Sequence, residues 1–395
     1  MIIEPRTRGF ICITSHPDGC AENVLSQIAY VKKNGVVGKA KKVLVIGAST
    51  GFGLASRITS AFGSNAATIG VFFEKPPAVG KTASSGWYNT VAFENEANKE
   101  NIYAKSINGD AFSNEIKQET IDLIKKDLGQ IDLLIYSLAS PVRTHPETKI
   151  RYKSTLKPIG KTFTDKTVDF HTGEVKSVSI EPCNEQDIEN TVTVMGGEDW
   201  QMWVDALQKE GLLSANFKTV AYSYIGPELT KAIYRNGTIG KAKDHLEKTA
   251  FTITDSLKKI NGKAYVSVNK ALVTQSSSAI PVIPLYISLL YKVMKEKNIH
   301  EGCIEQIYRL FKEHLFEKQV PTDTEGRIRI DDWEMREDVQ SKVAELWLEA
   351  TTETLPKIGD LAGYKTDFFN LFGFEFDAVN YQKNTNEVRT ISSIK

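Results

Sequence analysis

Tyr234 and Lys243 carry a phenol and an ammonium group within one short stretch, "AIYRNGTIGKAKDHLEK" (232–248). A phenol can donate a proton to a reacting group, and an ammonium group can hold an anionic one. On a straight α-helix, nine positions correspond to roughly 180° of rotation and a rise of about 13 Å, so the two side chains would point apart. Gly237 and Gly240 make this stretch a poor helix interior. We therefore predict a break that ends one helical turn at Tyr234 and lets both side chains reach one cleft, although a surface tyrosine and a surface lysine would show the same spacing.

A glycine-rich turn, "GASTGFG" (47–53), follows the β-branched run "KKVLVIGAS" (41–49). Glycines at such a strand-to-helix turn let backbone amides approach a pyrophosphate where the helix dipole favours negative charge. Glycine turns also arise for purely structural reasons, but the strand before and the helical pattern "GLASRITSAFG" (53–63) after it favour dinucleotide binding. The residues predicted to contact the cofactor here are Gly47, Ala48, Ser49, Thr50, Gly51, Phe52 and Gly53.

The next predicted strand, "ATIGVFFEK" (67–75), ends in Phe73 and Glu74, which we also assign to the cofactor site. A carboxylate at this point accepts hydrogen bonds from the two ribose hydroxyls of the adenosine half and repels the extra phosphate of NADPH. The sequence therefore predicts NADH. The neighbouring Lys75 is the one feature that would tolerate the phosphate.

Two further strand ends extend the predicted site. Asp110 and Ala111 follow the third strand, "IYAKSING" (102–109), where such folds commonly touch the adenine. Leu138 and Ala139 end the fourth strand, "IDLLIYSLAS" (131–140), beside the expected nicotinamide ribose. An ordinary strand-end turn is the alternative for each.

Strand and helix signals alternate along the chain, which predicts an α/β fold with a Rossmann-type, doubly wound parallel sheet. Helices are expected at 114–129, 229–236 and 241–258, and later strands at 218–226 and 263–272. A β-hairpin is expected around "HTGE", inserted within 150–185. From about residue 300 the chain reads as charged and helical, and its charge run "RIRIDDWEMRED" as a solvated face.

We expect one enlarged domain over 1–395. Within it, 41–140 would form the core dinucleotide-binding half, 150–185 the β insertion, 218–295 the catalytic and acyl-pocket region, and 300–395 a helical C-terminal extension.

Composition narrows the class of protein. Lys+Arg and Asp+Glu both total 49, so net charge gives no reason to expect nucleic acid or an anionic membrane as partner. The longest apolar run, "AIPVIPLYISLLY" (279–291), is too short to span a bilayer, and the N-terminus lacks a signal-peptide pattern. Four cysteines do not make a disulfide framework, which favours the cytoplasm. Cys12, His16 and Cys20 lack a fourth ligand nearby, so we assign no metal.

Longer segments carry a far more specific signal. The sequence resembles the trans-2-enoyl-ACP/enoyl-CoA reductases of the FabV type over nearly its whole length, in "GFICITSHPDGC", "SINGDAFS", "IYSLASPVRTHP", "MGGEDWQMW", "YSYIGPELT" and "VTQSSSAIPVIPLY". This family is an enlarged relative of the short-chain dehydrogenase/reductases, and its hallmark is a tyrosine and a lysine with eight residues between them. Tyr234 and Lys243 match that hallmark. Phe52 stands where many relatives carry tyrosine.

The resemblance implies an activity. NADH would reduce the 2,3-trans double bond of an enoyl thioester, with hydride added at C3 and a proton at C2. Tyr234 would be the proton donor, and Tyr224 would donate a hydrogen bond to the thioester carbonyl as charge develops there. Lys243 would bind the nicotinamide ribose or phosphate and lower the pKa of the tyrosine.

The resemblance also implies further contacts and partners. Leu272, Val273 and Thr274 would touch the nicotinamide through backbone groups, and an apolar helix from Ile280 to Leu290 would form one wall of the acyl pocket. The substrate would be carried by CoA or acyl carrier protein, and the enzyme would act as a monomer in fatty acid biosynthesis.

Two other functions remain open from the sequence. A short-chain ketoacyl reductase or alcohol dehydrogenase would need a tyrosine three residues before its lysine, which does not stand out after the fourth strand. A non-catalytic NADH-binding sensor would keep the glycine turn and lose the proton donor.

Overall fold

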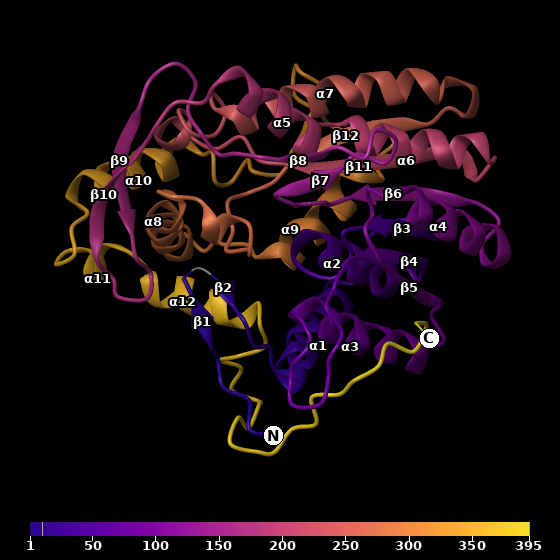
Figure 1. Ribbon diagram of the computed structural model, residues 1–395, viewed down its shortest axis with the longest axis horizontal. Coiled ribbons are helices and arrows are strands. Elements are labelled where there is room, and N and C mark those ends of the chain that lie inside the picture. Colours follow the sequence, from indigo (N-terminus) through magenta and orange to yellow (C-terminus); the bar gives the residue numbers. More distant parts are fainter. Residues whose placement is uncertain (10, 395) are drawn as a thin grey trace.

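Seven parallel strands form the central sheet in the computed structural model, which describes residues 1–9 and 11–394 (Figure 1). In chain order they are β3 (Lys42–Ile46), β4 (Ala67–Phe72), β5 (Ala104–Asn108), β6 (Ile131–Tyr136), β11 (Leu213–Ser223), β12 (Lys263–Val268) and β13 (Ile328–Arg329). Their spatial order is β13-β12-β11-β6-β3-β4-β5, and each neighbouring pair is parallel. The chain therefore winds outward from β3 in one direction and then from β6 in the other. This confirms the predicted doubly wound fold.

Helices cover both faces of the sheet, which explains why its strands are apolar without alternation. In β3, Val43 and Val45 belong to a core formed with one group of helices, while Leu44 and Ile46 belong to a core formed with another. The first group is α1 (Pro17–Asn34), α2 (Gly51–Ile58), α3 (Ser85–Lys99) and α9 (Cys303–Leu310). The second is α4 (Asn114–Asp127), α6 (Glu198–Lys209) and α7 (Thr238–Ser256).

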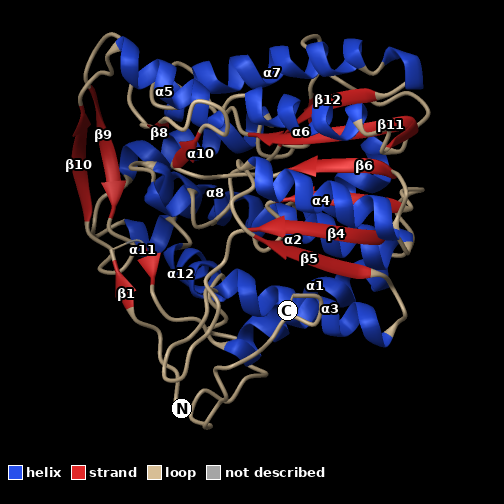
Figure 2. Cartoon of the chain, turned by 45° about the vertical axis from the view of Figure 1, so that its right-hand side comes forward, coloured by secondary structure: helices blue, strands red, loops and turns tan. Residues whose placement is uncertain are grey.

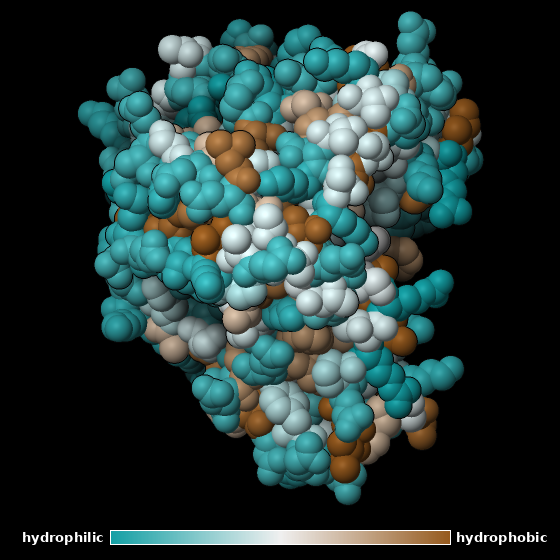
Figure 3. Space-filling model, turned by 90° about the vertical axis from the view of Figure 1, so that its left-hand side faces the viewer, coloured by the Kyte–Doolittle hydropathy of each residue, from teal (hydrophilic) through white to brown (hydrophobic). Residues whose placement is uncertain are grey.

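A third apolar core lies beside the sheet. It joins α8 (Ile283–Glu296), α10 (Glu337–Glu349) and α12 (Leu361–Asn370) to a hairpin of β9 (Phe163–Val168) and β10 (Val175–Ile180). The hairpin pairs antiparallel from Phe163↔Ile180 to Val168↔Val175, as the sequence predicted, and Figure 2 shows it standing apart from the main sheet. Figure 3 shows that this side of the molecule is mostly hydrophilic, with hydrophobic residues in small groups.

The remaining α-helices and strands are short or were not predicted. They are α5 (Glu185–Met195), α11 (Leu355–Ile358) and the antiparallel pairs β1 (Thr7–Arg8) with β2 (Ile11–Cys12) and β7 (Val142–Thr144) with β8 (Arg151–Lys153). Helices α1, α3, α5 and α6 fall in stretches that the sequence left unassigned. No helix among residues 1–9 and 11–394 is long and apolar enough to cross a membrane.

The helical C-terminal extension is shorter than predicted. Its last helix, α12, ends at Asn370, and the stretch 371–394 runs back along α3 without forming a helix. Two serines in it bind a fully buried carboxylate: Ser393 Oγ donates to Glu94 Oε1 over 2.6 Å, and Ser392 Oγ donates to Oε2 over 2.7 Å. This stretch therefore belongs to the same packed unit as the first strands.

Candidate active site

The turn between β3 and α2 depends on its glycines. Gly47 has a φ of +84° and Gly51 a φ of +54°, both in the left-handed region that favours glycine. A Cβ on Gly47 would lie 2.1 Å from the Ser137 carbonyl oxygen, and one on Gly53 would lie 1.9 Å from the Gly47 carbonyl oxygen. Thr50, the N-cap residue of α2, makes no side-chain capping bond. The first backbone amides of α2 therefore have the arrangement that binds an anion.

Glu74 is held beside this turn. Its carboxylate accepts a hydrogen bond from Ser49 Oγ at 2.6 Å, and its backbone pairs with the Asn108 side chain, with N–H to Oδ1 2.7 Å and Nδ2 to the carbonyl oxygen 2.9 Å. Burial raises the pKa of Glu74, and the Ser49 hydrogen bond opposes that shift. Phe73 instead points into solvent, with 78% of its surface exposed.

The other two predicted strand ends lie at the same edge of the sheet, and polar groups of the first of them, at Asp110 and Ala111, are engaged inside the protein. The Asp110 carboxylate accepts the Phe112 N–H at 3.0 Å, and the carbonyl oxygen of buried Ala111 accepts Trp203 Nε1–H at 3.1 Å. Leu138 is half-buried and Ala139 is exposed. Contact of these four residues with a cofactor stays a prediction.

The stretch between Tyr234 and Lys243 is not one helix. A 3₁₀ turn, η2 (Glu228–Thr230), is followed by turns through residue 236, and α7 starts at Thr238 after Gly237 in extended backbone. The predicted helix at 229–236 is therefore wrong. Gly240 lies inside α7, where a Cβ would come 1.9 Å from the Arg235 carbonyl oxygen, so its smallness serves close packing. The break is real but lies at Gly237 alone.

Both side chains reach the carboxyl end of β11. The Tyr234 ring packs edge-on against the Tyr224 ring, with centroids 4.8 Å apart and planes at 89°. Lys243 Nζ donates a hydrogen bond to the Tyr222 carbonyl oxygen at 3.4 Å. Since Tyr222 and Tyr224 are two residues apart at this strand end, the structure brings the phenol and the ammonium group to one region.

Burial controls the protonation of Tyr234, Tyr224 and Lys243. It raises the pKa of Tyr234, to which the nearby Glu334 charge also contributes, and it raises the pKa of Tyr224 well above its ordinary value. It lowers the pKa of Lys243 to about 8. The expectation that Lys243 lowers the pKa of Tyr234 is therefore wrong, because desolvation of the phenolate dominates. Both tyrosines keep their protons at neutral pH.

Sequence reasoning missed Glu334. It is fully buried, and its carboxylate accepts hydrogen bonds from the hydroxyls of Tyr224 at 3.1 Å and Tyr286 at 2.7 Å. Asp331 in the same charge run is also buried. The interpretation of this run as a solvated face is thus wrong at both positions. The only sequence signal was the alternation of arginine and isoleucine in "RIRI", at the start of the same run.

The segment after β12 makes its own internal contacts. Leu272 carbonyl oxygen accepts Ser277 Oγ–H at 2.7 Å, Val273 N–H donates to Tyr291 Oη at 3.2 Å, and Thr274 N–H donates to Ser277 Oγ at 2.9 Å. A pocket of about 260 Å³ brings this segment together with the glycine turn, since Leu272, Val273, Thr50 and Gly51 all line it. Tyr234, Tyr224 and Lys243 do not line this pocket.

The apolar helix begins later than predicted. Helix α8 starts at Ile283, with Pro284 in its first turn, and Ile280 precedes it. Between them, buried Val282 has a φ of +74°, a conformation that β-branched residues rarely adopt. Ile280 is half-buried and packs against the same apolar core as Tyr224 and Tyr234.

The cysteine and histidine cluster near the N-terminus has a structural role. His16 is the N-cap of α1, and its Nδ1 accepts the Gly19 N–H at 3.2 Å. Cys12 and Cys20 are buried free thiols. Among residues 1–9 and 11–394, no group of three or more His, Cys, Asp or Glu side chains is arranged to hold a metal ion.

Three family models match successive parts of the chain. Residues 2–79 match the NAD(P)H binding domain of trans-2-enoyl-CoA reductase, residues 81–316 match the trans-2-enoyl-CoA reductase catalytic region, and residues 322–385 match a model described as an enoyl reductase FAD binding domain.

Residues 322–385 do not fit a flavin. Their buried carboxylates are already paired, Glu334 with two tyrosines and Asp331 with Arg329 at 2.7 Å. Helices α10 and α12 pack their apolar faces into the core around α8. Where this segment reaches the 260 Å³ pocket it presents Asp367, Asn370, Leu371 and Phe376. We therefore assign no flavin step to this chain.

Similar proteins cover the whole chain. The chain is 74% identical over 396 residues to the enoyl-[acyl-carrier-protein] reductase [NADH] of Flavobacterium johnsoniae, with both chains fully covered. It is 60% identical over 381 residues to the trans-2-enoyl-CoA reductase [NADH] of Ruminiclostridium cellulolyticum, with 96% of each covered. The crystal structure of Treponema denticola trans-2-enoyl-CoA reductase in complex with NAD superposes with a TM-score of 0.95 at 52% identity, covering 99% of this chain and 100% of that one. This chain therefore belongs to the trans-2-enoyl-CoA reductase family.

Proposed function

We propose that this chain catalyses the NADH-dependent reduction of the trans-2,3 double bond of enoyl thioesters to the saturated acyl thioester, in fatty acid biosynthesis. The observation that supports this best is that the Tyr234 ring packs on the Tyr224 ring while Lys243 Nζ donates to the Tyr222 carbonyl oxygen, all at the carboxyl end of β11. In a doubly wound sheet, ligands bind at the carboxyl ends of the strands. The relatives named above act with NADH on enoyl groups carried by acyl carrier protein or CoA, as their names state.

In this proposal the tyrosines handle the charge that hydride addition creates. When bound, NADH supplies a hydride to C3 of the substrate. Negative charge then develops on the thioester oxygen, and Tyr224 stabilises it by donating a hydrogen bond, an effect of roughly 3 kcal/mol for one well-placed donor. Tyr234 gives its proton to C2. Because burial raises the pKa of both phenols, both are protonated and able to donate at neutral pH.

Initial rates of NADH oxidation with crotonyl-CoA test this function directly. Turnover to butyryl-CoA is the expected result. NADH binding without turnover, on either an enoyl-CoA or an enoyl-acyl carrier protein series, would contradict the proposal and favour a cofactor sensor. Turnover of a ketoacyl thioester in its place would favour a short-chain ketoacyl reductase.

Lys243 should make NADH binding depend on pH. We assign its ammonium group to the nicotinamide ribose or phosphate, and burial lowers its pKa to about 8. The charge is present below that pH and lost above it, so KM for NADH should rise severalfold as the pH passes about 8. Lys243→Met should have a high KM for NADH at every pH, with no rise near pH 8. Lys241→Met removes an exposed cation in the same helix and should leave the rise in KM for NADH near pH 8 unchanged. If KM for NADH of the wild-type enzyme does not change as the pH passes about 8, the assignment of Lys243 is contradicted.

Glu74 should determine the choice between NADH and NADPH. Glu74→Gln keeps the size of the side chain and the Ser49 contact but removes the charge that repels a 2′-phosphate. We expect KM for NADH to rise and the preference for NADH over NADPH to fall, on the order of tenfold. Glu119→Gln, at an exposed position on α4, is the matched control. A preference equal to that of the unmodified enzyme would exclude Glu74 from the adenosine site.

We further propose that the chain works as a monomer in the cytoplasm and as one enlarged domain. The contacts from Ser392 and Ser393 to Glu94 support the single domain, because they join the nucleotide-binding half to residues almost 300 positions later. Sedimentation of the purified protein tests the oligomeric state, and a single cooperative melting transition is expected for one domain.

A further inference from the structure

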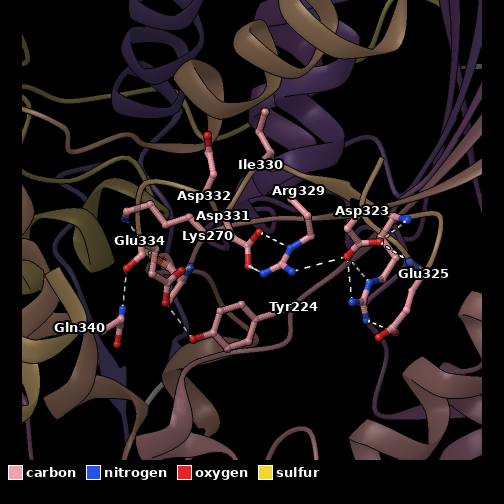
Figure 4. A network of polar contacts seen from close by, with 12 residues as sticks. Tyr224, Lys270, Asp323, Glu325, Arg329, Ile330, Asp331, Asp332, Glu334 and Gln340 are labelled. Atoms are coloured by element: carbon pink, nitrogen blue, oxygen red, sulfur yellow. Dashed lines mark hydrogen bonds and ion pairs between the residues drawn. The ribbon is translucent and has the colours of Figure 1, made fainter. Parts of the chain in front are cut away.

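Glu334 lies at the centre of a buried set of hydrogen bonds that ends at Tyr224 (Figure 4). Its Oε1 atom is 2.7 Å from the Tyr286 hydroxyl and 3.1 Å from the Tyr224 hydroxyl. Its Oε2 atom accepts the Ala271 N–H at 2.7 Å. The carboxyl group therefore touches the strand end that carries Tyr224, helix α8, and the start of the 271–274 segment.

The directions of most of these hydrogen bonds are fixed. Gln340 Nε2 donates to Tyr286 Oη at 3.1 Å, and an amide N–H can only donate. Tyr286 Oη accepts there, so its own proton points to Glu334 Oε1. Oε2 is likewise committed to accepting from Ala271. Of these partners, only Tyr224 can take either role: its single proton points to Glu334 when the carboxyl group is ionised, and away from it when Oε1 carries a proton.

Resting on the proposed function, in which Tyr224 donates to the thioester oxygen, we propose that Glu334 is a positioning residue that sets the direction of the Tyr224 hydroxyl proton. Protonated Glu334 donates to Tyr224 Oη, and Tyr224 donates to the substrate oxygen. Ionised Glu334 accepts the Tyr224 proton itself, and the substrate oxygen loses this donor. Only hydrogen bonds change between the two states.

The surroundings favour the protonated form. Burial is the largest influence and raises the pKa of Glu334, and the charge of Asp331 raises it further. The Tyr286 hydrogen bond, the charge of Lys270 and the Ala271 N–H act in the opposite direction without cancelling the effect of burial. Lys270 Nζ donates to the Ala271 carbonyl oxygen at 3.0 Å.

The phenols that face Glu334 are uncharged near neutral pH. Tyr224, Tyr234 and Tyr286 all have a pKa raised by burial. The phenols therefore stay uncharged, while Lys270, whose pKa burial lowers to about 8, is a second group facing Glu334 whose charge changes as the pH rises.

Glu334→Gln tests the proposal through the pH dependence of kcat/KM for crotonyl-CoA at saturating NADH. Saturating NADH suppresses the effect of Lys243 on cofactor binding. In the wild-type enzyme the rate should decline as pH rises through the Glu334 pKa, about tenfold for each pH unit above it. The amide of the variant has the same shape but does not ionise, so that decline should be absent. A variant that declines in parallel with the wild type, or that is inactive at every pH while still folded, would overturn the proposal.

Tyr286→Phe supplies a second test that keeps Glu334 in place. It removes a donor to the ionised carboxylate, so the pKa of Glu334 should rise and the decline should move to higher pH, by about one unit. Tyr308→Phe is the matched control, since the Tyr308 hydroxyl donates to the Asn34 carbonyl oxygen at the end of α1. A decline at the same pH in the Tyr286 variant contradicts the proposal even if the Glu334 variant fails to fold. If wild-type enzyme reduces no enoyl thioester, the proposed function fails instead.

Discussion

Tyr234→Phe should lower kcat/KM for crotonyl-CoA by roughly 10²- to 10⁴-fold, the range expected when a general acid is removed. The variant keeps the ring, so its edge-on contact with Tyr224 and the surrounding packing should survive. The affinity for NADH should remain unchanged, because the proposed cofactor contacts lie in the glycine turn, at Glu74 and at Lys243. Stopped-flow NADH oxidation measures the first effect, and quenching of protein fluorescence by NADH measures the second.

A tyrosine outside the proposed site provides the control for this prediction. Tyr265 is half-buried on β12, and Tyr265→Phe should retain the wild-type rate. A wild-type rate in the Tyr234 variant would show that the proton comes from another group. A matching loss of NADH affinity would show that Tyr234 acts in cofactor binding.

Gly53→Ala should both destabilise the protein and abolish NADH binding at ordinary cofactor concentrations. The new Cβ would lie 1.9 Å from the Gly47 carbonyl oxygen, a backbone atom that cannot move without shifting the end of β3. Overpacking of this kind costs about 1–3 kcal/mol or more, and here the displaced backbone is the one that would bind the pyrophosphate. Thermal denaturation with and without NADH measures both effects, and we expect a lower melting temperature with no stabilisation by the cofactor.

Gly51 offers a matched comparison in the same turn. It has a φ of +54°, but a Cβ there would meet nothing within 4 Å. Gly51→Ala should therefore cost only about 1 kcal/mol, from the left-handed backbone. If the two variants were equally stable and bound NADH equally well, close approach of α2 to β3 would not be what the glycines provide.

Local pattern was enough to predict the core of the fold. The apolar run "VLVI" requires cover on both faces, which is what a doubly wound sheet supplies, and the glycine turn places the start of α2 where the strand ends. The poor helix-forming quality of "NGTIG" correctly predicted a break between Tyr234 and Lys243, since α7 starts after Gly237. These features depend on residues close together in the sequence.

The rest depended on tertiary contacts. Glu334 reads as a surface charge in "RIRIDDWEMRED", and only the fold brings it to Tyr224, 110 positions earlier. The start of α8 was predicted too early because Pro281 fits a helix start as well as Pro284 does, and the unusual backbone of Val282 has no sequence signature. The pKa of Tyr234 was predicted in the wrong direction because a sequence does not show how deeply a phenol is buried.

The Glu94 contacts have a consequence for how this protein is made. Strands β3, β4 and β5 leave the ribosome well before residues 387–393, which supply hydroxyl, amide and carbonyl partners to Glu94, Trp87 and Tyr88. Until that stretch arrives, Glu94 has the Ser106 hydroxyl as a donor to Oε1, but Oε2 lacks the Ser392 and Ser393 donors that it has in the full chain. Burying a carboxylate oxygen without its donors is costly, so closure of the nascent nucleotide-binding half around Glu94 is disfavoured. Vectorial folding should therefore pause at α3, leaving an interval in which chaperones can act on it.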